Sequence, residues 1–432
     1  MEKAQVLELF ELPYSDLLLL SSDQAHSSSS SPAKLERLEL LKRTIMETLG
    51  PMGPGLLSVS GVPNAAVLRH DLPLARRLAL LDSDLRNRIL KENKLGSDVP
   101  LKNPERNVSS FAMQLRYVDQ NSNSGGGEFH DRVKGFGDGE FKNLGSDLRE
   151  LGFCMMELGL RLARVCDSAI GGRELELSLL ESCATKGRLI HYHSKLDGQL
   201  LLKQKKKGVK KKKEKQGNVD VDVEHGGIRE GSGSNLWQQW HYDYGIFTVL
   251  TAPLFLTQAV EGGGGQIMES GYEECGYPNG HTCLQIFDPN KKGIFMVDCS
   301  PESFIIQVGE SAEVISKGNL RATLHSVLRP GKLENLSRET FVVFLQPAWD
   351  KVLCISDYPM KCLSLEDQYL SISSAEEEEE GILEQQNRIE EIEKIVPPLS
   401  SRLKDGMTFA EFSRETTRQY YGGSGLQSNS SR

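Results

Sequence analysis

Two potential metal-binding side chains stand two residues apart in a β-prone stretch near the middle of the chain. Residues 237–245 read WQQWHYDYG and contain His241 and Asp243. Successive side chains of a strand point to opposite faces, so these two residues share a face and can aim at one point. A third potential ligand, His325, follows 84 positions after His241 (325 − 241) in another apolar, β-prone run. A fold that places these two runs side by side gathers three ligands.

The chemistry of the three side chains narrows the kind of site. Two imidazoles and one carboxylate on one face of a metal, with the opposite face open, form the ligand set of non-haem Fe(II) oxygenases. His241, Asp243 and His325 are therefore candidate iron ligands. The alternative is a hydrogen-bonded His–Asp pair without a metal, because such pairs arise by chance in a chain with nine histidines.

A potential carboxylate-binding pair follows the second histidine. Arg338 and Thr340 alternate along a β-prone run, so a guanidinium and a hydroxyl share one face. Together with Gly309-Glu310 and residues 315–319, this order resembles the plant-type 2-oxoglutarate and Fe(II)-dependent dioxygenases of the isopenicillin N synthase-like superfamily. Segments 55–63, 71–91 and 403–412 resemble a first-domain strand, the helix after it and a closing helical element, which extends the likeness over most of residues 36–422.

The resemblance implies an oxidoreductase that uses O2 and 2-oxoglutarate, with release of succinate and CO2, to oxidise and by expectation hydroxylate a small organic molecule. It implies that Fe(II) binds His241, Asp243 and His325, with ascorbate as a candidate reductant. It also implies that Arg338 and Thr340 bind the distal carboxylate of 2-oxoglutarate. The rival class is a non-catalytic, dioxygenase-like binding or regulatory protein.

Aromatic residues near the first two presumed ligands are candidates to line a substrate pocket. Trp240, Tyr244 and Phe247 are the residues concerned. Their alternative role is in the apolar core.

One motif departs from the resembling family. The family carries an Asn-Tyr-Tyr stretch before its metal-binding strand, with the Asn and the second Tyr holding the co-substrate, and His191 and His193 stand at those two positions here. A histidine can still donate a hydrogen bond to a carboxylate. Co-substrate binding by these histidines, use of another keto acid, a second metal site and a paired core role all remain open.

Short alternating segments dominate the second half of the chain. Residues 284–287, 293–297 and 304–308 alternate like strands and are separated by turn residues. With helices before and after, they predict a mainly β fold with flanking helices (α+β), built on a double-stranded β-helix or jelly roll. We expect an N-terminal helical and mixed region at 1–135, a long support helix within 136–185, the jelly-roll core at 186–350, and a C-terminal helical region and tail at 351–432.

A lysine-rich insertion interrupts the expected core at residues 203–234. Nine lysines lie between positions 203 and 215, and acidic and glycine-rich stretches follow. Like charges repel and few apolar residues are present, which predicts disorder. A solvated loop, a nuclear-import signal, a contact with RNA or another anionic surface, and a lid are the alternatives.

Composition limits the functional class further. A net charge of −9 argues against general nucleic-acid binding, because phosphate contacts need a positive surface. Eight scattered cysteines without close pairs predict reduced thiols. No secretory segment and no apolar run near 18 residues is evident, which predicts a cytoplasmic or nuclear protein without a membrane partner. The substrate and the oligomeric state cannot be read from the sequence.

Overall fold

The computed structural model describes residues 5–22, 31–97, 99, 101, 106–117, 138–182, 185–215, 235–258, 271–288, 291, 293–356 and 390–421. The elements before the core are β1 (Val6–Glu8), β2 (Glu11–Pro13), α1 (Tyr14–Leu20), α2 (Pro32–Leu49), β3 (Leu56–Ser60), α3 (Ala65–Leu68), α4 (Leu74–Leu80), α5 (Ser83–Glu92), β4 (Val108–Gln114), α7 (Leu144–Ile170) and α8 (Glu174–Leu180).

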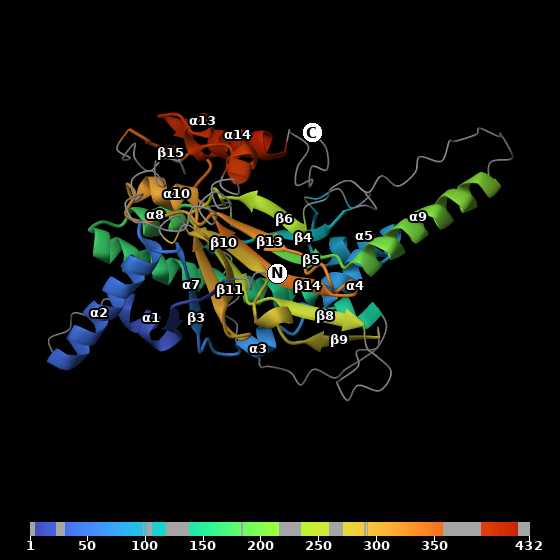
Figure 1. The fold of residues 1–432 in the computed structure, drawn as a ribbon, viewed down its shortest axis with the longest axis horizontal. Helices are drawn as coiled ribbons and strands as arrows, with labels where there is room; N and C mark the ends of the chain where they lie inside the picture. Colours follow the sequence, from blue (N-terminus) through green and yellow to red (C-terminus); the bar gives the residue numbers. More distant parts are fainter. Residues whose placement is uncertain are drawn as a thin grey trace, which may run out of the picture.

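The core and the C-terminal region follow in chain order (Figure 1). They comprise β5 (Lys186–Tyr192), α9 (Lys195–Lys215), β6 (Leu236–His241), β7 (Phe247–Thr251), β8 (Leu254–Gln258), β9 (Tyr272–Cys275), β10 (Leu284–Asp288), β11 (Gly293–Asp298), β12 (Phe304–Val308), α10 (Glu310–Ile315), β13 (His325–Leu328), β14 (Ser337–Leu345), β15 (Val352–Leu353), α13 (Leu399–Arg402), β16 (Met407–Thr408) and α14 (Phe409–Tyr421).

The core strands form two facing sheets. The large sheet has the order β2-β3-β12-β7-β14-β5-β4, and the small sheet has the order β1-β11-β10-β13-β6. Strand β5 lies in the large sheet, β6 in the small sheet and β7 in the large sheet again. After the β8–β9 hairpin, β10 and β11 lie in the small sheet, β12 in the large sheet, β13 in the small sheet and β14 in the large sheet. This winding is that of a double-stranded β-helix, so the predicted fold class is confirmed.

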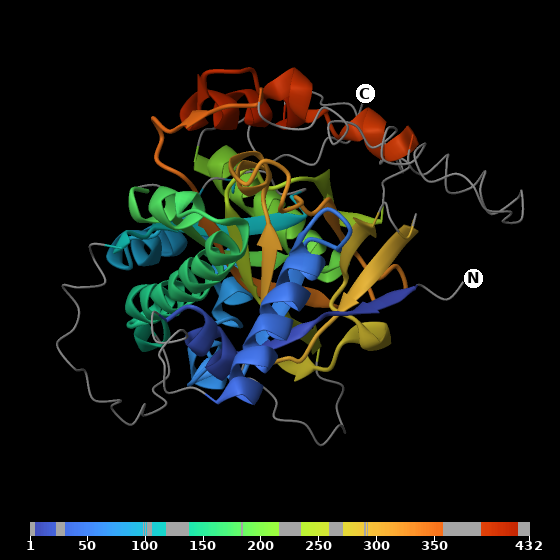
Figure 2. The same cartoon turned by 90° about the vertical axis from the view of Figure 1, so that its left-hand side faces the viewer.

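Alternation along β14 divides the side chains of the large sheet between two environments. Phe341, Val343 and Leu345 face outward into the core that the sheet shares with α7. Val342 faces inward, where it packs with residues of both sheets such as Ile190 and Ile286. Helix α7 lies within 136–185, where the long helix was expected, and its leucines recur at the spacing of one helical face. Figure 2 shows the helices grouped around the β core.

Two helical regions differ from the sequence-based expectations. The segment 71–91 contains two helices instead of one, because Asp82 accepts hydrogen bonds from the backbone of residues 84 and 85 and begins α5. Residues 203–215, predicted to be disordered, continue α9, which projects from the β core in Figure 1. Residues 216–234 of the insertion lie outside the described residues.

The C-terminal region packs against α10 of the core. An apolar cluster joins Val314 of α10 to Leu399 of α13 and to Phe409 and Phe412 of α14. Residues 357–389 and 422–432 of the predicted C-terminal region and tail are outside the described residues. Within the described residues, we find no helix with the length and apolar character of a membrane span.

Candidate functional site

The structure brings the three predicted metal ligands together at one end of the β-helix. His241 is the last residue of β6, and it pairs across the small sheet with His325, the first residue of β13. Asp243 lies just beyond β6, and its two carboxylate oxygens lie 3.8 Å from His241 Nε2 and 3.7 Å from His325 Nε2. The two imidazole rings are 4.3 Å apart between centroids. Three donor groups therefore surround one point.

Neighbouring groups fix the orientation of all three side chains. His241 Nδ1 donates a hydrogen bond to the Gln239 carbonyl at 2.8 Å, and His325 Nδ1 donates to the Thr323 carbonyl at 3.0 Å. In these tautomers each Nε2 carries a lone pair beside Asp243. The Thr248 hydroxyl donates to Asp243 Oδ2 at 2.7 Å. Such partners orient the ligands of metal sites.

The electrostatics of this group also suit metal binding. Burial, followed by the charge of His325, lowers the pKa of His241 to about 4. The ring is therefore neutral at pH 7, which is the form that binds a metal. The Gln238 amide lies 3.0 Å from His241 Nε2 and donates to it, and a metal at this nitrogen would replace that bond. Two imidazoles and one carboxylate fit Fe(II).

Arg338 and Thr340 lie on the inward face of β14, as their spacing predicts. Arg338 is 2% exposed, its Nε donates to the Thr282 carbonyl at 3.1 Å, and its guanidinium carbon lies 5.1 Å from the centre of the Tyr192 ring. The Thr340 hydroxyl contacts the hydroxyl and the carbonyl oxygen of Thr251, each at 3.2 Å. A guanidinium and a hydroxyl thus face the interior of the β-helix.

Tyr192 and Gln238 connect this pair to the three presumed metal ligands. Tyr192 lies directly across from Arg338 in the pairing of β5 with β14. Its hydroxyl donates to Gln238 Oε1 at 3.0 Å, and the amide nitrogen of Gln238 reaches His241. Sequence reasoning assigned neither residue to the site. The only signal for Tyr192 was its place within the stretch compared with Asn-Tyr-Tyr.

The structure places His191 and His193 away from Arg338. His191 pairs with Glu339 on the outward face of the large sheet, where its Nδ1 lies 2.9 Å from both Glu339 oxygens. His193 Nε2 lies 2.8 Å from the Ser109 hydroxyl. Side chains alternate along a strand. If the family's Asn-Tyr-Tyr stretch is aligned with this chain one residue earlier or later, the residues compared therefore lie on the opposite face of the sheet. This geometry disfavours the predicted co-substrate role of the two histidines, and Tyr192 is the residue of this stretch that faces Arg338.

The two outward histidines have opposite charge preferences. Burial alone lowers the pKa of His191, but Glu339 and Asp197 outweigh it and raise that pKa to about 9. Burial, reinforced by His191, holds the pKa of His193 well below its ordinary value. The His191 ring is thus favoured as a cation beside the two carboxylates, and the His193 ring stays neutral.

The predicted pocket aromatics occupy three different surroundings. Phe247 is fully buried in the core shared with α7, and Trp240 is buried beside Phe287 and Leu324. Tyr244 packs against Phe409 of α14 with ring centroids 5.9 Å apart. For Phe247 and Trp240 these contacts fit the alternative core role.

No family model matches the chain, and a search of curated proteins finds no match. Among solved structures, this chain is similar to a full-length Neurospora crassa protein in complex with alpha-KG and 5-formyluracil. The two are 14% identical over 97% of this chain and 99% of that chain, with a TM-score of 0.48. It is similar to the rice dioxygenase for auxin oxidation at 16% identity, over 83% of this chain and 89% of that chain, with a TM-score of 0.44. JOX2 in complex with 2OG, Fe and JA matches at 12% identity over 94% of this chain and 84% of that chain, with a TM-score of 0.48. At such identities and TM-scores, these likenesses assign no ligand or activity to this chain.

Proposed function

We propose that this protein is an Fe(II)- and 2-oxoglutarate-dependent oxygenase that hydroxylates a small organic molecule, with release of succinate and CO2. The observation that carries the proposal is the convergence of His241 Nε2, His325 Nε2 and the Asp243 carboxylate inside a double-stranded β-helix. Both rings are held in the metal-binding tautomer by backbone carbonyls. A merely structural His–Asp pair does not require two imidazoles oriented in this way.

The three converging side chains would hold the iron, and bound iron would supply the activation of O2. Thr248 keeps Asp243 oriented through the hydroxyl that donates to Oδ2. The apolar residues of the β-helix interior, among them Leu250, Ile286 and Val327, exclude water from the space beside these ligands. The polypeptide therefore contributes position and a dry surrounding.

Arg338 would bind the distal carboxylate of 2-oxoglutarate, and Thr340 would donate a second hydrogen bond to it. The support is that both side chains are buried on the inward face of the same strand. Tyr192 faces the same interior and already reaches Gln238, so its hydroxyl is available to help orient the keto acid. A buried guanidinium favours a carboxylate because the charge needs a counter-ion.

Substrate-independent turnover of 2-oxoglutarate tests this proposal. The protein would be incubated with Fe(II), ascorbate, O2 and 2-oxoglutarate, and succinate would be measured for wild type, Arg338→Met and the exposed control Arg43→Met. We expect succinate from wild type and the control, and at least a tenfold loss in Arg338→Met with iron binding retained.

Two other results would redirect the assignment. Iron binding combined with turnover of a different keto acid would preserve the oxygenase and reject 2-oxoglutarate. A folded wild-type protein that binds no iron would contradict the enzyme and favour the non-catalytic, dioxygenase-like binding protein.

A further inference from the structure

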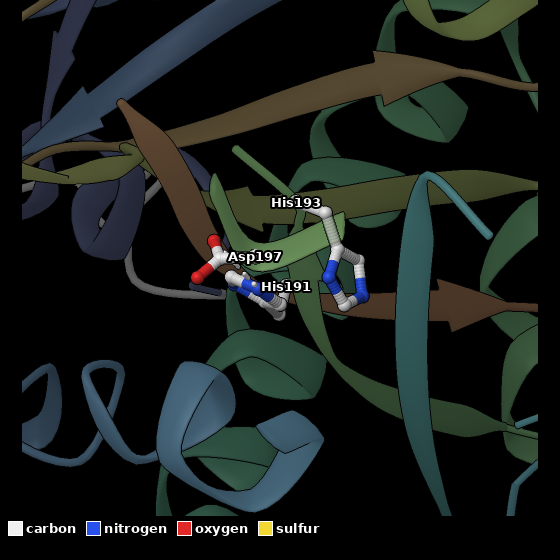
Figure 3. Close-up of side chains that lie close together, drawn as sticks. All are labelled: His191, His193 and Asp197. Carbon is white, nitrogen blue, oxygen red and sulfur yellow. Dashed lines mark ion pairs between the residues drawn. The ribbon is translucent and has the colours of Figure 1, made fainter. Parts of the chain in front are cut away.

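A second group of potential metal ligands lies behind the large sheet, formed by His191, His193 and Asp197 (Figure 3). His191 belongs to the end of β5, His193 follows that strand, and Asp197 lies in the first turn of α9. All three side chains are buried, and their ligand atoms lie within 4.8 Å of one another. We propose that this group, named here the rear site, binds a zinc ion independently of the proposed iron site.

Each ligand of the rear site is oriented by a partner on one of its polar atoms. His191 Nδ1 is bound to Glu339, and His193 Nε2 is 2.8 Å from the Ser109 hydroxyl. Asp197 Oδ1 accepts a hydrogen bond from Arg76 at 2.6 Å. The other atoms are His191 Nε2, His193 Nδ1 and Asp197 Oδ2, of which Asp197 Oδ2 already accepts hydrogen bonds from Ser194. Partners on the far atoms of the ligands are a regular feature of metal sites, and a His–carboxylate pair is the commonest of them.

Two of these other atoms lack hydrogen-bond partners. Within the described residues, His191 Nε2 and His193 Nδ1 are buried without one. Buried polar atoms are normally satisfied, so each exception calls for an explanation such as a missing ion. A zinc ion bound to both nitrogens would supply it.

The distance between two of the ligand atoms also matches metal coordination. His191 Nε2 lies 3.5 Å from Asp197 Oδ2, which is long for a hydrogen bond. The separation is close to the roughly 3.4 Å expected between two donors about 2.1 Å from one tetrahedral zinc. Asp197 Oδ2 also accepts from the backbone and hydroxyl of Ser194, which hold it in place.

The donor set of the rear site is the same as that of the proposed iron site, and it also suits zinc. Two imidazole nitrogens and one carboxylate oxygen are ordinary zinc ligands, and zinc imposes little geometric demand of its own. The rear site is on the outward face of the sheet, whereas Arg338 and the proposed co-substrate site are on the inward face. Bound zinc would tie β5 to the start of α9, so we expect a structural role.

The test counts zinc ions on the full-length chain. Protein would be loaded with Zn²⁺, passed through a desalting column with a weak chelator, and measured for metal by elemental analysis. Because zinc also binds His₂-carboxylate sites, we expect two zinc ions in wild type and one in the His241→Ala/His325→Ala double variant. That double variant leaves the rear site untouched.

Further variants locate the second ion. His193→Phe added to the double variant should abolish zinc binding, and Ser109→Ala should weaken it about tenfold through loss of the orienting hydroxyl. His281→Phe is the matched control, because His281 is also buried but lies in neither group, and it should keep both ions. The proposal is overturned if the folded double variant binds no zinc, or if folded His193→Phe in that background keeps its ion. In the first case a proton, and not a metal ion, bridges His191 to the carboxylates.

Discussion

At the scale of single residues, Thr248 sets the orientation of a presumed iron ligand. Its hydroxyl donates to Asp243 Oδ2 at 2.7 Å. Thr248→Val preserves the shape of the side chain and removes this bond, so we predict an increase of about 10- to 100-fold in the dissociation constant for Fe(II). Competition with a coloured chelator would measure it. Thr257→Val, on strand β8, is the control, and equal affinities for the two variants would contradict the role of Thr248.

The residues of the site differ in how far sequence alone could identify them. His241 and Asp243 were predicted as a pair because residues two apart on a strand share a face, although β6 ends at His241 and Asp243 lies just beyond it. The same periodicity groups His191 with His193 but cannot say which face they take. That choice depends on the pairing of Tyr192 with Arg338, which is a property of two strands distant in sequence.

At the scale of elements, close packing of α7 against the large sheet depends on Gly159. A Cβ at this position would overlap the Leu345 side chain of β14. We predict that Gly159→Ala lowers the free energy of unfolding by about 1–3 kcal/mol, because overpacking forces neighbours to shift. Gly198→Ala in α9 is the matched control, since a Cβ there meets nothing within 4 Å. It should raise stability by about 0.5–1 kcal/mol. Urea denaturation distinguishes these results, and equal effects would count against the packing account.

A buried ion pair attaches the C-terminal helices to the loop that carries Asp243. Arg402 donates to both oxygens of Glu310 at 2.7 and 2.5 Å, and the Glu310 backbone donates to the Asp243 carbonyl at 2.8 Å. We predict that Arg402→Met costs about 3–5 kcal/mol of unfolding free energy, because Glu310 loses its counter-ion inside the protein. Adding Glu310→Gln should recover part of the loss. An effect below about 1 kcal/mol in guanidinium denaturation would show that the pair is dispensable.

Helix α9 includes the lysine-rich residues 203–215, for which local charge alone predicted disorder. Lysine is a good helix former once a helix has begun. Ser194 and Asp197 form a reciprocal capping pair, in which the Asp197 backbone donates to the Ser194 hydroxyl and the Ser194 backbone donates to the Asp197 carboxylate. Asp197 is further held by Arg76 of α4. The sequence contains the capping residues, but the anchor on α4 arises from tertiary contact.

At the scale of the whole molecule, the order of short strands predicted the double-stranded β-helix. Alternating apolar residues and turn residues repeat between 284 and 308, and the two ligand-bearing runs had to lie side by side. The structure pairs them directly, as β6 and β13. The order of the strands could not predict the contact of α10 with the C-terminal helices. That contact joins side chains from segments about 90 residues apart, such as Glu310 and Arg402.

The most direct measurement is anaerobic binding of Fe(II) and 2-oxoglutarate to the purified protein, followed by visible absorption. We predict a weak charge-transfer band that requires both ligands and is absent in His241→Ala, because that variant removes one of the three converging donors. His281→Gln, a substitution at a buried histidine outside the group of three converging ligands, should retain the band. Absence of iron binding by folded wild-type protein, or an undiminished band in His241→Ala, would contradict the proposed metal centre.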